Sequence, residues 1–336
     1  MSKRLIRGSF SALKWLLCAV GAIALLLTAL VATPLSRPPE LHSISATHGT
    51  VDMSALPAIE RFQARDGTSL GFRHYAPTGA ATGRGAIVVH GSTGSSGTSI
   101  HALSAALAAR GVETWAIDIR GHGVSGTRGD IAYLGQLEDD LADFIAVLRK
   151  ANPAVPLTLI GHSAGGGFAL RIAASPIQNQ FARTVLLAPY LGYNAPTNRP
   201  DSGGWARADV PRFIGLGILR RIGIDCCGSL PVLAFAVPRN SEAIQTGIYS
   251  DRLMRNFANH PDYRGDLAAV THPMTIFAGA DDELMLADEY AEAVRGIQPA
   301  IDVKLIDGTN HMGIVTAPKA VSAIADDVAT RGMAGS

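Results

Sequence analysis

LTLIGHSAG, residues 157–165, joins a short buried-strand pattern to a helical pattern through a turn that contains Ser163. The run Leu157–Ile160 is apolar, as in a strand covered on both faces, and helical sequence continues over 164–174. A G-x-S-x-G turn between a strand and a helix is typical of a nucleophile elbow, in which the serine backbone is strained and the glycines prevent collisions. We therefore predict Ser163 as a nucleophile at a helix N-terminus, where free N–H groups favour negative charge. A glycine-rich turn with a capping serine is the alternative.

His311 is the candidate base for this serine. A serine hydroxyl is a poor nucleophile unless a base takes its proton. His311 ends the loop GTNH, 308–311, directly after the last predicted strand, Val303–Ile306. This loop comes at the carboxyl end of its strand, the same sheet edge as Ser163. The other nine of the ten histidines lie in the N-terminal segment, in glycine loops, or without a partner motif.

An acid that orients the histidine is expected after another strand. Residues 279–282, GADD, follow the predicted strand Thr275–Ala278. The chain order Ser, Asp, His is the one known for nucleophiles on a strand–turn–helix elbow. Two neighbouring aspartates compete for the role, and we favour Asp282 over Asp281. The acid would hold the tautomer of the base and stabilise its imidazolium form.

Two backbone amides are expected to stabilise the oxyanion. Ala164, the residue after the nucleophile, supplies one N–H group. The loop 90–97, HGSTGSSG, follows the first predicted parallel strand, and we assign the second donor to the backbone of Ser92. A phosphate-binding loop is disfavoured, because no lysine follows with Walker spacing. The G-x-G-x-x-G match at 121–126 follows the second parallel strand and opens no helix, so it predicts no dinucleotide site.

Alternation of strands and helices predicts an α/β fold with a mostly parallel sheet. Short apolar runs predict the parallel strands, and longer helical patterns lie between them. A hairpin over 60–64 and 70–75 is expected at the sheet edge. The predicted parallel strands are Ala86–Val89, Glu113–Ile117, Leu157–Ile160, Thr184–Leu187, Thr275–Ala278 and Val303–Ile306.

The N-terminal segment has a different composition from the rest. Residues 15–32 are eighteen residues without a charge, and Lys3, Arg4, Arg7 and Lys14 precede them. Such a length crosses a bilayer core, and the basic flank places the N-terminus in the cytoplasm. We expect a single-pass anchor in the cell inner membrane with the rest of the chain exported. A cleaved signal peptide followed by secretion is the alternative.

The domain organisation follows from these patterns. Residues 1–32 form the anchor or signal segment, and 33–57, rich in proline and serine, form a linker outside the fold. Residues 58–189 and 267–332 form the α/β core. Residues 190–266 carry no clear strand pattern and are expected to form a cap inserted over the carboxyl edge of the sheet.

Composition excludes several classes of function. With 29 basic and 28 acidic residues, the net charge is +1, which argues against nucleic acid as the partner. Three cysteines are too few for a disulfide scaffold, and none has zinc-site spacing. Cys226 and Cys227 receive no functional role. No metal and no cofactor is expected.

Together these motifs resemble the α/β-hydrolase superfamily, within it the serine aminopeptidase, monoacylglycerol lipase and lysophospholipase-like group. The resemblance covers about residues 60–329 and rests on the segments quoted above, together with DIRGHGVS at 118–125. It implies an eight-stranded sheet, a helical cap after the sixth strand, and no cofactor. The family pattern carries over to Ser163, Asp282 and His311 as the triad and to Ser92 and Ala164 as the oxyanion donors.

The sequence therefore predicts a serine-dependent carboxylic ester hydrolase acting on a small-molecule or lipid ester. An acyltransferase or an amidase would use the same acyl-enzyme, and a non-catalytic binding protein of the same fold is a third possibility. The cap would select the acyl group. Within it, 205–224 has apolar residues at helical spacing, and we expect them to pack on the domain; contact with lipid is the alternative.

Overall fold

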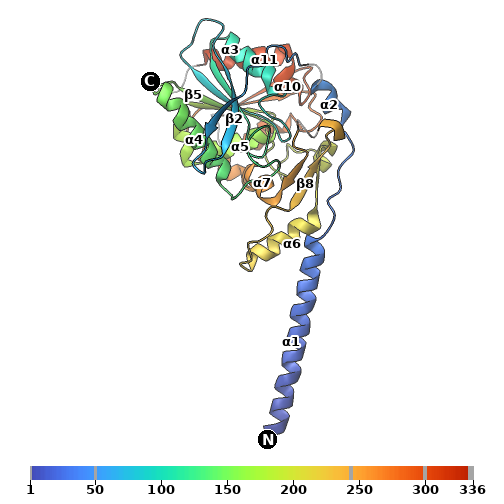
Figure 1. Ribbon diagram of the computed structural model, residues 1–336. Helices are drawn as coiled ribbons and strands as arrows, with labels where there is room; N and C mark the ends of the chain where they lie inside the picture. Colours follow the sequence, from blue (N-terminus) through green and yellow to red (C-terminus); the bar gives the residue numbers. More distant parts are fainter. Residues whose placement is uncertain (1, 49–50, 242–244, 298–300, 332–336) are drawn as a thin grey trace.

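The computed structural model describes residues 2–48, 51–241, 245–297 and 301–331. Its centre is an eight-stranded sheet in the order β1-β2-β4-β3-β5-β6-β10-β11 (Figure 1). The hairpin strands β1 and β2 are antiparallel to each other, β2 is antiparallel to β4, and the remaining neighbours are parallel. The α/β prediction and the hairpin prediction are both confirmed. The strands are β1 (Glu60–Gln63), β2 (Ser69–Tyr75), β3 (Gly85–Val89), β4 (Glu113–Ile117), β5 (Leu157–His162), β6 (Arg183–Leu187), β10 (Met274–Gly279) and β11 (Asp302–Ile306).

Helices cover both faces of this sheet. On one face lie α3 (Ile100–Ala109), α10 (Gly313–Thr316) and α11 (Pro318–Thr330); on the other lie α4 (Gln136–Ala151), α5 (Ala164–Ala173), α8 (Tyr263–Ala269) and α9 (Glu289–Val294). Short 3₁₀ turns occur at Pro176–Gln180, Pro200–Gly204 and Arg239–Ser241.

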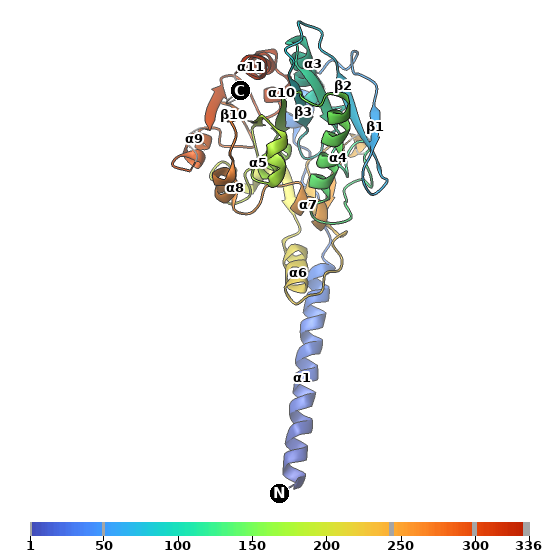
Figure 2. The same ribbon diagram turned by 90° about the vertical axis from the view of Figure 1, so that its left-hand side faces the viewer.

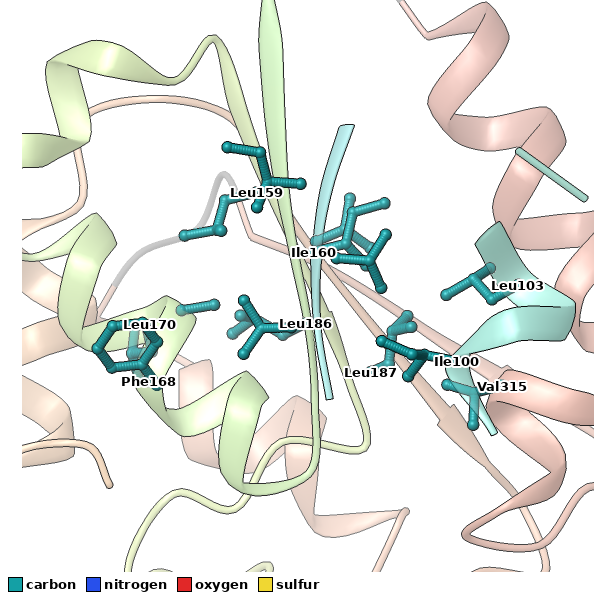
Figure 3. Close-up of a cluster of buried hydrophobic side chains, with 14 of the residues drawn as sticks. Ile100, Leu103, Leu159, Ile160, Phe168, Leu170, Leu186, Leu187 and Val315 are labelled. Carbon is teal, nitrogen blue, oxygen red and sulfur yellow. The ribbon is translucent and has the colours of Figure 1, made fainter. Parts of the chain in front are cut away.

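The core consists of two apolar layers separated by the sheet. Figure 3 shows Phe168 and Leu170 of α5 on one side of the strands, and Ile100, Leu103 and Val315 on the other. All five side chains are fully buried. The central parallel strands β3, β5, β6 and β10 are buried along their whole length because helices remove both of their faces from water, whereas the edge strand β11 is only partly buried.

A long insertion lies between β6 and β10, where the sequence predicts a cap after the sixth strand, and we call it the cap. It contains α6 (Val210–Arg221) and α7 (Asp251–Asn256), but also an antiparallel sheet of β7 (Ala206–Ala208), β8 (Pro231–Phe235) and β9 (Ile248–Ser250). The segment 190–266, expected to be a helical cap without a clear strand pattern, is therefore not purely helical. These strands are only three to five residues long, and their partners are separated by intervening helices or loops, so local periodicity does not reveal them.

The apolar side chains of α6 do not pack on the domain. Phe213, Ile214 and Ile218 are 41%, 49% and 40% exposed. The expectation that the cap buries its apolar residues against the core is wrong for this helix, since only Leu216 among its large apolar residues is buried.

The N-terminal helix α1 (Ser2–Val31) projects from the domain as a single long rod (Figure 1 and Figure 2). Within the described residues it is the one helix long and apolar enough to cross a membrane, over Leu13–Val31 with a mean hydropathy of 2.2.

The segment after α1 returns to the domain. The short helix α2 (His42–His48) follows a proline-rich stretch, and the amide of Leu41 donates to the carbonyl of Ala236 at 3.1 Å. The side chain of Ile44 is 2% exposed and belongs to the hydrophobic core. The prediction that 33–57 lies wholly outside the fold is therefore wrong around α2, because Ile44 is buried in the core and Leu41 packs against it.

Candidate active site

Ser163 occupies the sharp turn between β5 and α5. Its backbone has φ 54° and ψ −118°, outside the regions that side-chain-bearing residues normally adopt. Gly161 and Gly165 make this turn possible, because a Cβ on Gly161 would lie 2.1 Å from the carbonyl oxygen of Gly165. A Cβ on Gly165 would lie 2.3 Å from the carbonyl oxygen of His90. The turn has the strained geometry that the sequence predicts.

Three side chains from three separate loops form one hydrogen-bonded chain. The Oγ of Ser163 lies 3.0 Å from Nε2 of His311, and Nδ1 of His311 lies 2.8 Å from Oδ2 of Asp282. His311 follows β11 and Asp282 follows β10, so parallel strands bring both loops to the carboxyl edge of the sheet beside Ser163. With its Nδ1 proton held by the carboxylate, His311 presents Nε2 as an acceptor for the Ser163 hydroxyl.

The carboxylate of Asp282 is buried and saturated with donors. Its Oδ1 accepts the backbone N–H groups of Leu284 at 2.8 Å and Met285 at 2.7 Å. Burial by itself would raise its pKa, but the charge of His311, their hydrogen bond and these two amides outweigh burial and lower the pKa. Asp281 is exposed and reaches this region only through its backbone N–H, which donates to the carbonyl of Thr309. Of the two candidate acids, only Asp282 faces the histidine.

His311 is 2% exposed. Burial favours the neutral ring, but the charge of Asp282, its hydrogen bond and the charge of Glu283 outweigh burial and raise the pKa of His311 above its ordinary value of 6.5. A carboxylate oxygen of Glu283 also accepts the backbone N–H of His311 at 2.9 Å. The role of Glu283 was not predicted from the sequence. Its position directly after Asp281 and Asp282 is the one sequence feature that could have suggested a contact with His311.

The predicted oxyanion donors lie on either side of the nucleophile. Within the described part of the chain, neither the Ser92 amide nor the Ala164 amide has an acceptor. A Cβ on Gly91 would lie 3.4 Å from the Cβ of Ser163, so the 91–92 backbone approaches the nucleophile closely. These two N–H groups are therefore free for a ligand atom.

The loop that carries Ser92 is held by the buried His122 and the half-buried Trp205. The Nε2–H of His122 donates to the carbonyl of Ser92 at 2.7 Å, and Nε1–H of Trp205 donates to the hydroxyl of Ser92 at 3.0 Å. Burial, followed by the neighbouring ring of His90, lowers the pKa of His122 to about 3, so its ring stays neutral. These two contacts could not be predicted from the sequence, because they join segments far apart in the chain.

A small cavity lies directly beside Ser163. It is lined by Ser92, His311 and Leu284 of the core, by Trp205 of the cap and by Ile44 of α2, and its volume is about 20 Å³. That volume holds about one water molecule. A group larger than a water molecule therefore fits only if lining side chains move.

The described residues contain no group of three or more His, Cys, Asp or Glu side chains placed to hold a metal ion. The arrangement can deprotonate a hydroxyl, stabilise the resulting imidazolium, and donate two hydrogen bonds to an anion.

Known proteins match this chain in sequence and in fold. The family model described as serine aminopeptidase, S33, matches residues 83–315, more than half of the chain. A monoacylglycerol lipase of Mycolicibacterium smegmatis is 30% identical over 108 residues, which are 32% of this chain and 38% of that protein. The chain thus matches well under half the length of that curated relative.

Two solved structures share the fold. A soluble variant of monoglyceride lipase from Saccharomyces cerevisiae, in complex with a substrate analogue, superposes with a TM-score of 0.62 and 17% identity, over 83% of this chain and 96% of that one. A membrane phospholipase A, described as a bacterial virulence factor, gives a TM-score of 0.53 and 15% identity, over 97% of this chain and 99% of that one.

Proposed function

The chain belongs to the serine aminopeptidase family S33 of the α/β-hydrolase superfamily, and on that basis we propose that it is a serine-dependent carboxylic ester hydrolase. One observation carries the proposal: the Oγ of Ser163 lies 3.0 Å from Nε2 of His311, whose other nitrogen is held by a buried carboxylate. A hydroxyl placed in this way loses its proton to the imidazole as it attacks a carbonyl carbon.

The proposed reaction has two halves. Ser163 attacks the ester carbonyl while His311 takes its proton, and the amides of Ser92 and Ala164 hold the oxyanion. His311 then gives the proton to the departing alcohol, which leaves an acyl group on Ser163. Water, deprotonated by His311, attacks this acyl-enzyme and releases the carboxylic acid and the free serine. Asp282 keeps its charge throughout and stabilises the imidazolium form of His311.

We propose a lipid ester as the substrate class. The relatives named as monoacylglycerol lipase, monoglyceride lipase and phospholipase A all act, by name, on acyl glycerol lipids. Apolar side chains of Ile44, Trp205 and Leu284 at the cavity support an acyl group rather than a charged one.

We also propose that α1 anchors the protein as a single span in the cell inner membrane. Residues from Trp15 to Leu26 expose large apolar side chains around the helix, with Trp15 and Leu25 75% and 74% exposed. Basic residues precede the span, which orients the N-terminus to the cytoplasm and the catalytic domain to the other side. The match to the membrane phospholipase A covers 97% of the chain and so includes most of α1.

Covalent labelling tests the chemistry. The full-length protein is treated with a fluorophosphonate probe, and the labelled peptide is identified by mass spectrometry. The expected site is Ser163, and Ser163→Ala should abolish labelling and lower ester turnover by about 10⁴-fold or more. Ser104→Ala, a buried serine on α3 outside the site, is the matched control and should keep both. Labelling that survives Ser163→Ala would refute the proposal.

A further inference from the structure

Cap helix α6 exposes a continuous apolar stripe. Val210, Phe213, Ile214 and Ile218 recur at helical spacing on one side of the helix, and the chain after its end continues the stripe. We call this set the α6 apolar face: Val210, Phe213, Ile214, Ile218, Ile222 and Ile224, which are between 40% and 61% exposed. Exposed apolar residues that gather in one patch mark an interaction surface, unlike residues scattered singly.

The opposite side of α6 is fixed to the end of α1. A Cβ on Gly215 would lie 3.0 Å from the Cγ2 of Val31 and 3.1 Å from the Cβ of Leu30, so the two helices meet closely. The guanidinium of Arg212 donates through Nε to the carbonyl of Val31 at 2.8 Å and also reaches the carbonyl of Thr33.

A second hydrogen bond closes the same junction. The hydroxyl of Thr33 donates to the carboxylate of Asp209 at 2.7 Å, and that carboxylate also caps α6 by accepting the backbone N–H of Arg212. The junction thus holds α6 at the level of the last turn of α1, as both views show (Figure 1 and Figure 2).

If α1 spans a bilayer, the length of its apolar part fixes how deep α6 lies relative to the membrane surface. The 19 residues of Leu13–Val31 span about 28 Å at 1.5 Å per residue, close to the hydrocarbon thickness of about 30 Å. Val31 then lies where the hydrocarbon ends and the headgroups begin, on the side of the catalytic domain. An amphipathic helix held at that level buries its apolar face in the boundary between headgroups and acyl chains.

We propose that the α6 apolar face is seated in the leaflet nearest the catalytic domain, so that the cap itself binds the membrane that α1 spans. The occupant of the face is lipid, and this rests on the proposed anchoring of α1. Arg221 in the last turn of α6 is exposed, and a long basic side chain at a membrane surface can extend to lipid phosphates.

This placement connects the membrane to the active site. Only the short strand β7 separates α6 from Trp205, which lines the cavity and donates to Ser92. A cap seated in lipid therefore links the membrane, through β7, to a residue of the cavity wall.

Depth-dependent quenching tests the seat of α6. Single-cysteine variants of the full-length protein, made after Cys18, Cys226 and Cys227 are replaced by serine, carry an environment-sensitive fluorophore in vesicles that contain doxyl-labelled lipids. Ile218→Cys should show a blue-shifted emission and at least about a threefold loss of intensity with the quencher near the headgroups. Val147→Cys, at a similarly exposed apolar position on α4, is the matched control and should show neither change.

A third position separates the two proposals. Leu25→Cys lies in the middle of the span and should be quenched by deep doxyl groups. If Leu25→Cys is not quenched, the anchor itself is refuted; if it is quenched while Ile218→Cys behaves like Val147→Cys, only the seat of α6 is refuted. Protection of Ile218→Cys from aqueous iodide without quenching by doxyl lipid would mean that a second protein copy covers the face, and would also overturn the inference.

Activity gives an independent readout. The double variant Phe213→Ser with Ile218→Ser should turn over an ester embedded in vesicles at least about tenfold more slowly than the wild type, while the rate on a water-soluble short-chain ester stays within about twofold. Val147→Ser should change neither rate. An equal fall on both substrates would overturn the inference, because the face would then act on the cap rather than on the membrane.

Discussion

Asp282→Asn should lower kcat for a short p-nitrophenyl ester by about 10³- to 10⁴-fold, because it reverses the proton arrangement on His311. In the native site, Oδ1 of Asp282 accepts the amides of Leu284 and Met285 at 2.8 and 2.7 Å, and Oδ2 accepts the Nδ1 proton of His311 at 2.8 Å. An asparagine keeps its carbonyl oxygen on the two amides, since an NH₂ group there would face two donors. Its NH₂ group therefore points at Nδ1, the ring proton moves to Nε2, and Nε2 no longer accepts from Ser163.

The magnitude follows from two effects. Removing a unit charge about 4 Å from the forming imidazolium costs about 4 kcal/mol at an effective dielectric constant of 20, which is about three powers of ten in rate. The wrong tautomer acts in the same direction, and an Asp→Asn change in Ser-His-Asp proteases costs about 10⁴-fold. We therefore expect the loss in kcat to fall between these values, with little change in KM.

Asp281→Asn is the matched control for this experiment. The side chain of Asp281 is exposed, and the substitution leaves its backbone bond to Thr309 in place, so its kcat should stay within about twofold of the wild type. Initial rates are measured on both variants, with thermal unfolding followed by circular dichroism to confirm that each is folded. A folded Asp282→Asn enzyme that retains more than a tenth of the wild-type kcat, or an Asp281→Asn enzyme impaired to the same extent, would refute this account of the site.

Three further outcomes are expected. The rate should rise with pH through a pKa above 6.5 and be lost below it, because the raised pKa of His311 keeps the ring protonated, and so unable to act as a base, to higher pH; a kcat/KM profile that is flat from pH 5 to 8 would contradict this. Glu283→Gln should move that rising limb to lower pH, since it removes a charge that raises the pKa of His311, and an unmoved limb would exclude Glu283 as a positioning residue. Ile44→Ala should raise kcat/KM for long acyl esters more than for short ones while lowering the unfolding temperature, because it empties a buried site beside Ser163. Ile44→Val serves as its control, and equal effects on long and short esters would argue against Ile44 as a barrier.

The central sheet and the chain order Ser163, Asp282, His311 could be predicted from local sequence patterns. Strands buried on both faces can be predicted from their local sequence, because each is a short apolar run with helical sequence on either side. The elbow at Ser163 is equally local, since Gly161 and Gly165 meet backbone atoms within the turn and the neighbouring strand. Loops at the carboxyl ends of parallel strands must share one edge, so the approach of Asp282 and His311 to Ser163 follows from topology alone.

The contacts around this site could not be predicted from the sequence, because they join segments that are distant in the chain. Glu283 at the amide of His311 and His122 on the carbonyl of Ser92 join segments whose own patterns contain no sign of the partner. The burial of Ile44 and the exposure of the α6 apolar face likewise depend on tertiary contacts. Ile44 is 2% exposed although its segment was predicted to be a linker, whereas the apolar residues of α6 stay exposed. Apolar periodicity predicts that one face of a helix is removed from water. Whether the protein core or lipid covers that face depends on the elements that pack next to the helix.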